Sequence, residues 1–96
     1  MDNYIVNKSV ADEMGIDAAL FYQYIKERFI EDAIEEISAV PQKWVNVKDY
    51  EILNKFQCFA AEDVTRIKRY LARQNYVGHK LQHDKYGVAS SWYCIL

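Results

Sequence analysis

The chain has 96 residues with a formal net charge of −2, of which 51% are apolar and 27% are charged, and it contains one proline and three glycines. This composition suits one globular domain that buries about 60–65% of its unfolded surface, and it argues against a linker or a disordered tail. No apolar run approaches the roughly 20 residues of a bilayer span and the first ten residues lack a signal-peptide pattern, so we expect a cytoplasmic protein without membrane contact.

The charge is unevenly distributed along the chain. Residues 1–55 carry 6 Lys and Arg against 11 Asp and Glu, a balance of −5. Residues 56–96 carry 6 against 3, a balance of +3, and contain both histidines. A basic carboxy-terminal part in an acidic chain indicates local contact with an anionic partner.

The first third of the chain predicts two helices. Ser9 can cap a short helix that ends at Gly15, and Asp17 can cap the next one. Apolar residues cover so wide an arc of the second helix that it is either a core helix or a subunit contact. The side chains for a possible contact with a second copy are Leu20, Phe21, Tyr24 and Phe29.

The second helix is expected to continue through IEDAIEEISAV until Pro41 stops it. Glu27, Glu31 and Glu35 would then form an acidic ridge along it, which is typical of a solvated helix face. We expect this ridge to do no more than repel nucleic acid.

The middle of the chain predicts a strand and two helices. KWVNV (43–47) suits a short strand, and DYEILNKF (49–56) suits a two-turn helix. After QCF the helical period restarts, and at about 100° per residue it separates an apolar side from a polar side. The apolar side carries Ala60, Val64, Ile67, Lys68 and Leu71, with Lys68 at its edge, and the polar side carries Glu62, Thr65, Arg66, Arg69 and Arg73.

The last third of the chain predicts a β-hairpin. NYVGHKL and VASSWYCIL consist largely of strand formers, and QHDKYG between them contains turn residues. The order of elements is that of a winged helix-turn-helix. We therefore expect a single, mainly α domain with a small β-hairpin, of the α+β class, over residues 1–96. Its helical scaffold would cover 1–40, and its strand, helix-turn-helix and wing would cover 43–96.

The arginines of the last helix are candidates for contact with double-stranded DNA. Arg66, Arg69 and Arg73 are three and four residues apart, so each pair of like charges costs about 0.2–0.5 kcal/mol. Glu62 can pair with Arg66, which leaves Arg69 and Arg73 without a local partner. Two interpretations remain open: solvated arginines on an exposed helix, or arginines that bind phosphates.

The hairpin adds further basic and aromatic residues. Its tip is expected to carry His79, Lys80, His83, Lys85 and Tyr86, either against a phosphate backbone or minor groove, or as a polar loop. A metal site at His79 and His83 is not expected, because a hairpin tip does not bring such a pair together with further ligands. The predicted DNA-binding residues are Thr65, Arg66, Arg69, Arg73, His79, Lys80 and Lys85.

The first residues of the last helix argue against DNA binding. Ala61, Glu62 and Asp63 occupy the positions that usually read base edges. Their carboxylates suit the helix dipole but repel phosphates, unless one accepts a hydrogen bond from a cytosine amino group. The alternative is a protein-interaction domain with little DNA binding, which dimerises or docks on a partner. A phage inhibitor of a host nucleic-acid enzyme would be one such protein.

Motifs for catalysis were not found in the sequence. It contains no G-x-S-x-G, no Gly-rich phosphate loop and no H-E-x-x-H. Cys58 and Cys94 are far apart and outside any C-x-x-C pair, which is typical of reduced cytosolic thiols. We therefore expect neither an enzyme nor a cofactor, a metal ion or a small-molecule substrate.

Several residues fit a known family pattern over most of the chain. Ala11, Gly15, Ile16 and Ala19 match A-x-x-x-G-h-x-x-A, Trp44 opens a strand, Phe56, Val64, Arg66 and Leu71 match the second half of the pattern, and Trp92 and Tyr93 match its closing strand. In these residues the chain resembles the amino-terminal winged-helix domain of phage and mobile-element replisome organisers, relatives of the DnaD-type replication initiators. Ala60 and Asn75 depart from the pattern, which has Ser and Gly there.

The resemblance implies binding at a replication origin and recruitment of helicase machinery, in some cases with self-association of this domain. A homodimer or a replication protein would then be a partner besides DNA, and transcription regulation is a related role. Among the predicted DNA-binding residues, the resemblance implies only Arg66. The others come from the helical wheel and the hairpin.

Overall fold

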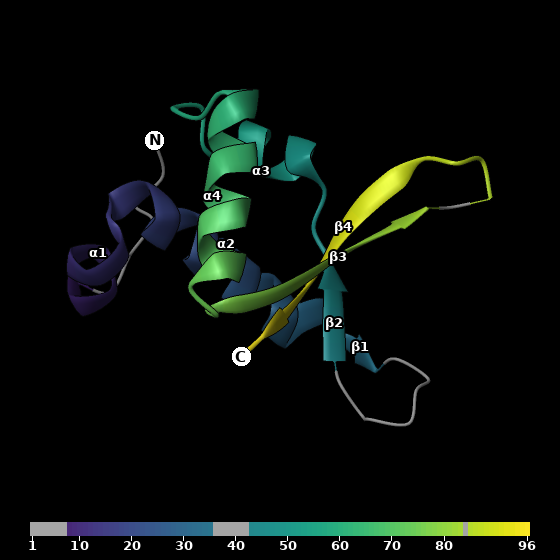
Figure 1. Cartoon of the computed structure of the whole chain (residues 1–96), viewed down its shortest axis with the longest axis horizontal. Helices are drawn as coiled ribbons and strands as arrows, with labels where there is room; N and C mark the ends of the chain where they lie inside the picture. Colours follow the sequence, from purple (N-terminus) through teal and green to yellow (C-terminus); the bar gives the residue numbers. More distant parts are fainter. Residues whose placement is uncertain (1–7, 36–42, 84) are drawn as a thin grey trace.

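The computed structural model describes residues 8–35, 43–83 and 85–96, and in this part of the chain helices lie beside an antiparallel sheet (Figure 1). The helices are α1 (Lys8–Met14), α2 (Ile16–Asp32), α3 (Asp49–Lys55) and α4 (Ala61–Arg73). The strands are β1 (Ile34–Glu35), β2 (Lys43–Asn46), β3 (Val77–His83) and β4 (Ala89–Ile95). The predicted α+β class is confirmed, as are the strand, two helices and hairpin predicted after residue 42.

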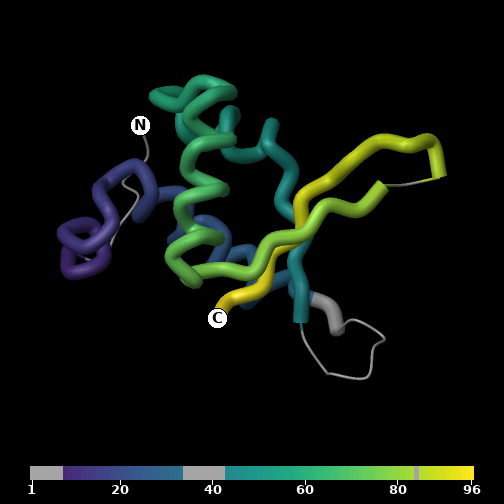
Figure 2. Tube along the Cα trace, in the orientation of Figure 1, coloured from purple at the N-terminus to yellow at the C-terminus, as the bar shows by residue number. Residues whose placement is uncertain are grey.

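The strands lie in the order β1-β2-β4-β3, so β4 separates β2 from β3. Val77–His83 of β3 pair with Ile95–Ala89 of β4 along their full length. On the other side of β4, Tyr93 pairs with Val45 of β2. The outer half of the hairpin extends away from the helices (Figure 2).

The core lies between the sheet and helices α2, α3 and α4. Phe21 of α2, Ile52 of α3 and Leu71 of α4 are at most 1% exposed, and they belong to one cluster with Val45 and Tyr93 of the sheet. The ring of Phe21 meets that of Tyr93 edge to face, with 6.3 Å between ring centres. Apolar residues at helical spacing thus supply one face of each of these helices, and the sheet supplies the other wall.

The possible self-association surface on α2 is largely used inside the chain. Leu20 and Phe21 are buried, so they cannot form a surface contact with a second copy in this fold. Tyr24 and Phe29 are partly buried against the same core. The Tyr24 hydroxyl also donates to Glu51 of α3 over 3.2 Å. The core interpretation of α2 is therefore the correct one for Leu20 and Phe21.

Gly15 makes the junction between α1 and α2. Its φ is +88°, a conformation that glycine adopts without a Cβ clash, and it is the N-cap residue of α2. Ser9 lies inside α1, and no side chain caps the start of α2. The predicted capping roles of Ser9 and Asp17 are therefore wrong, because the chain turns at the glycine.

The predicted continuation of α2 towards Pro41 is also wrong. The helix ends at Asp32, and Ala33 has an extended backbone with ψ of 135°. Ile34 then pairs with Trp44, so a sheet contact replaces the next helical turn. Glu35 therefore lies in β1 and not on the acidic ridge, whereas Pro41 is outside the described residues.

Arg28 joins α2 to the sheet and to α3. Its guanidinium donates to the carboxylate of Asp32 over 2.9 Å and to the backbone carbonyl of Asn46 over 3.2 Å. It also forms an ion pair with Glu51, which in turn accepts the backbone N–H of Lys48 over 2.8 Å at the start of α3. These contacts fix the position of α3, against which α4 packs.

Candidate nucleic-acid interface

Asp63 is engaged in starting α4. Its carboxylate accepts the backbone N–H of Ala60 over 2.8 Å, which supplies a partner for one of the free N–H groups of the first turn. This hydrogen bond lowers the pKa of Asp63 below its ordinary value. One of the two carboxylates that argue against DNA binding thus has a structural role, and Glu62 is left exposed beside it.

The buried side of α4 sets the direction of its exposed side. Val64, Ile67 and Leu71 are at most 1% exposed and belong to the core cluster. Lys68 lies at the edge of this side, as the helical wheel predicts, and its ammonium is 2.9 Å from the carboxylate of Asp49. With these contacts fixed, the polar side of α4 points towards solvent.

A groove of about 550 Å³ lies between α4 and β3. We call it the α4–β3 groove, and its lining residues are Thr65, Lys68, Arg69, Ala72, Arg73, His79 and Leu81. Four of the seven predicted DNA-binding residues, Thr65, Arg69, Arg73 and His79, thus lie in one place. They come from a helix and a strand that follow each other in the chain.

The positive charges of the two arginines in the α4–β3 groove are not balanced by an acidic side chain of the described residues. Arg69 and Arg73 are exposed and stand one helical turn apart. No acidic side chain of the described residues pairs with either of them. The groove therefore presents two neighbouring guanidinium groups, each with its donors available to a ligand.

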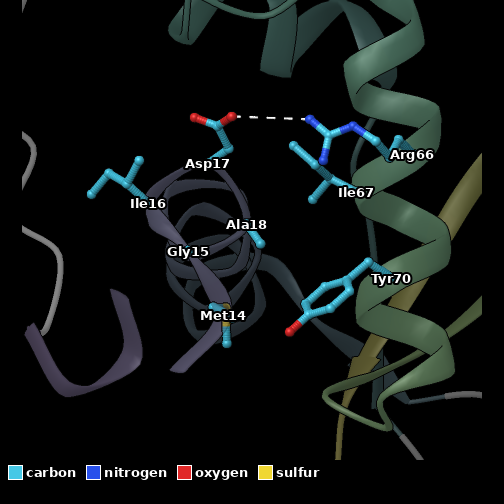
Figure 3. A pocket seen from close by; sticks show the side chains of 8 residues that line it. All are labelled: Met14, Gly15, Ile16, Asp17, Ala18, Arg66, Ile67 and Tyr70. Atoms are coloured by element: carbon cyan, nitrogen blue, oxygen red, sulfur yellow. Dashed lines mark ion pairs between the residues drawn. The ribbon is translucent and has the colours of Figure 1, made fainter. Parts of the chain in front are cut away.

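Arg66 lines a different pocket beside α4 and not the α4–β3 groove. Its guanidinium is 3.4 Å from Asp63 and 3.9 Å from Asp17, so the predicted pairing with Glu62 is replaced by these two partners. Figure 3 shows the Asp17 pair joining the start of α2 to α4, beside a second pocket of about 420 Å³ that also includes Tyr70. Both side chains are more than half exposed, so this pair contributes little to stability.

His79 is not at the hairpin tip, because β3 continues to His83. It lies opposite Tyr93, with 5.1 Å between the ring centres, and it faces the α4–β3 groove. Burial lowers the pKa of His79 below 6.5, and the charge of Lys68 lowers it further, while Asp49 acts in the opposite direction. The lowered pKa favours the neutral imidazole.

Lys80 is also within β3, and alternation along the strand turns it to the opposite face of the sheet. Its ammonium lies 4.3 Å from the centre of the Trp44 ring, in a cation–π contact. Lys85 remains near the end of the hairpin, with its ammonium 5.1 Å from the centre of the Tyr86 ring. The predicted tip cluster is thus divided between two faces and the loop.

Sequence reasoning missed Leu81 as a residue of the groove. Its side chain is 58% exposed and lines the α4–β3 groove beside the arginines. The signal was present, since residues two apart on a strand share a face and Leu81 is two residues after His79. The strand simply extends further than the turn residues suggested.

The described residues contain no cluster of three or more His, Cys, Asp or Glu that could hold a metal ion. None of the helices in this part of the chain has the length and apolar character to cross a membrane. Comparison with known protein families, with curated proteins and with solved structures gave no significant match. The function is therefore inferred from the geometry and charge of the α4–β3 groove.

Proposed function

We propose that this chain is a non-catalytic, cytoplasmic winged helix-turn-helix domain that binds double-stranded DNA through α4 and the hairpin. The observation that carries the proposal is the pair Arg69 and Arg73, exposed on α4 without an acidic partner among the described residues. The topology supports it, since α4 is the second of two successive helices and a hairpin follows. In helix-turn-helix proteins that second helix is the one that enters the major groove.

A phosphate group suits the two arginines chemically. Their like charges repel each other at a cost of about 0.2–0.5 kcal/mol while no anion is bound. A phosphate oxygen bound by both guanidinium groups would remove this repulsion and form charge-assisted hydrogen bonds. Thr65 lies one turn before Arg69 in the same groove, and its hydroxyl, which donates to the carbonyl of Ala61 over 3.4 Å, would have to turn to reach a phosphate.

The acidic start of α4 limits how the helix can lie on DNA. Glu62 is exposed at this end, while the arginines follow it by two and three turns. We expect the phosphates to lie along the carboxy-terminal turns of α4, at the end of the helix away from Glu62. The resemblance to replisome organisers supports a role in replication initiation, or in transcription regulation, of a phage or mobile element.

Fluorescence anisotropy of labelled random-sequence duplex DNA at about 50 and 200 mM salt tests the proposal. The variant Arg69→Ala/Arg73→Ala should bind more weakly, and its log–log salt slope should be lower by about 0.9 per lost phosphate contact. The matched control, Lys8→Ala/Lys26→Ala, removes the same charge from α1 and α2, outside the α4–β3 groove, and should retain the salt slope.

Two results would contradict DNA binding at this groove. If both variants lose the same affinity, net charge and not the groove determines binding. If the unmodified protein does not bind at about 100 μM, it is weaker than ordinary non-specific binders. The protein-interaction alternative would then be favoured for the same arginines.

A further inference from the structure

β3 is an edge strand whose open side presents free backbone groups. Among the described residues it pairs only with β4, and the N–H of Leu96 donates to the carbonyl of Tyr76 over 3.4 Å at the start of the hairpin. In an antiparallel ladder, hydrogen-bonded pairs alternate along the strands. Even-numbered residues of β3 therefore direct their N–H and C=O groups to β4, and His79, Leu81 and His83 direct theirs away from it.

The backbone groups on this open side have no partner in the described part of the chain. Backbone bonds to another element are absent there for His79, Leu81 and His83. The same stretch of β3 forms one wall of the α4–β3 groove, where Leu81 is 58% exposed. An extended chain placed along the open side of β3 would therefore run beside α4.

The charge of the α4–β3 groove indicates which kind of extended chain could bind along β3. Arg69 and Arg73 line the α4–β3 groove together with His79 and Leu81 of β3. A side chain on every second residue of an added strand would face α4, because side chains alternate between the faces of a strand. Acidic residues at these alternate positions would reach the two unpaired guanidinium groups.

We propose that an acidic, extended segment of a partner protein adds to the open side of β3 as a further strand. Its main chain pairs with Leu81 and the residues two before and two after it, and its carboxylates bind Arg69 and Arg73. Strand addition of this kind obtains affinity from main-chain hydrogen bonds and specificity from alternate side chains. This interaction is distinct from DNA binding, although both ligands use the same arginines and must compete.

A second copy of β3 is a poor occupant of the same position. β3 carries Lys80 and contains no acidic side chain that could pair with Arg69 and Arg73, and like charges placed opposite each other destabilise a strand pair. Basic residues on an edge strand are also a known protection against pairing with an identical edge. The edge thus excludes its own copy while it accepts an acidic strand.

Hydrogen exchange measured by NMR, on the full chain labelled with ¹⁵N, tests the proposal. The probe is a blocked synthetic peptide of alternating Glu and Val, as long as β3. At saturation, the amide protons of Leu81 and His83 should exchange at least about tenfold more slowly than in the free protein. Those of Lys80 and Gln82, which already bond to β4, should change little.

Two control peptides and one variant separate strand addition from attraction by charge alone. A peptide of alternating Lys and Val should not bind, and a Glu and Val peptide methylated at every second backbone nitrogen should lose the protection. Arg69→Ala/Arg73→Ala should weaken binding of the Glu peptide. Absence of binding, or binding without protection of Leu81 and His83, would overturn the proposal.

A competition with duplex DNA distinguishes this inference from the proposed function. If the protein binds DNA but not the Glu peptide, only the strand-addition proposal is wrong. If the protein binds the peptide with protection of its amide protons but does not bind DNA, only the DNA-binding proposal is wrong. If both ligands bind, an excess of one should displace the other.

Discussion

The ammonium group of Lys68 lies 2.9 Å from the carboxylate of Asp49 and 3.4 Å from the hydroxyl of Ser91. One side chain of α4 thereby contacts the first turn of α3 and the central strand β4. Lys68 is 14% exposed, so much of its charge is removed from solvent and depends on these partners. Asp49 is about half exposed, which limits how much the pair can stabilise the fold.

We expect Asp49 and Lys68 to be energetically coupled by about 1 kcal/mol. Urea unfolding of the unmodified protein, Asp49→Asn, Lys68→Met and the double variant would give this coupling energy. Methionine keeps the apolar part of the lysine packing, so the cycle measures the charge interaction. A coupling energy near zero would show that the contact is only geometric.

Gly78 should not tolerate a methyl group. A Cβ atom at this position would lie 2.5 Å from the sulfur of Cys94 and 3.6 Å from the ring of Trp44. Cys94 is 3% exposed and cannot move freely. We expect Gly78→Ala to lower the free energy of unfolding by about 1–3 kcal/mol, as overpacking commonly does.

The same clash predicts a rescue. In a Cys94→Ala background the sulfur is absent, so Gly78→Ala should cost less than it does in the unmodified protein. Denaturant titrations of both single variants and the double variant measure this. Strictly additive effects would show that the loss comes from the backbone of residue 78 and not from the contact with Cys94.

The stability of the fold should fall on mild acidification because of His79. The pKa of His79 is lowered in the folded state, so the unfolded chain binds its proton more readily. The contribution of neutral His79 is present above pH 6.5 and is lost as the pH falls from there through the lowered folded-state pKa. Urea unfolding at pH values on both sides of this range measures it.

His79→Phe should reduce this pH dependence, because it keeps a ring against Tyr93 and removes the titrating group. His83→Gln is the matched control, since His83 is exposed at the end of β3 and should leave the dependence in place. An unchanged pH dependence in His79→Phe would assign the effect to other groups.

Tyr76 should titrate at unusually high pH. Its hydroxyl donates a hydrogen bond to Glu13 of α1, and this bond raises the pKa of Tyr76 to about 12. Glu13→Gln should return the pKa towards 10, whereas Glu31→Gln, on the exposed side of α2, should not. NMR titration of ring-labelled tyrosine measures both. If Glu13→Gln has no effect, α1 does not contact Tyr76 in solution.

Elements with a strong local pattern could be predicted from the sequence. The buried and exposed sides of α4 agree with the helical wheel, because Val64, Ile67 and Leu71 leave only one orientation that hides them. The hairpin was also predictable, since strand formers flank a turn segment. Only its length was wrong, as Gln82 and His83 pair with Ser90 and Ala89 and do not form the turn.

Elements that depend on distant residues could not be predicted. The end of α2 is set by the pairing of Ile34 with Trp44, and a glutamate-rich segment by itself favours continuing the helix. In the same way, Arg66 pairs with Asp17 from another helix, a contact that the wheel alone could not show. The wheel therefore grouped Arg66 with the two arginines of the α4–β3 groove.

The position of β4 has a consequence for how the protein is made. β2 and β3 each lie next to β4 and not next to each other, and β4 follows both in the chain. During synthesis the sheet cannot assemble until residues up to Ile95 have left the ribosome. Until then Val45 and Val77 lack the strand that pairs beside them, so the nascent chain exposes apolar surface that is buried in the finished fold.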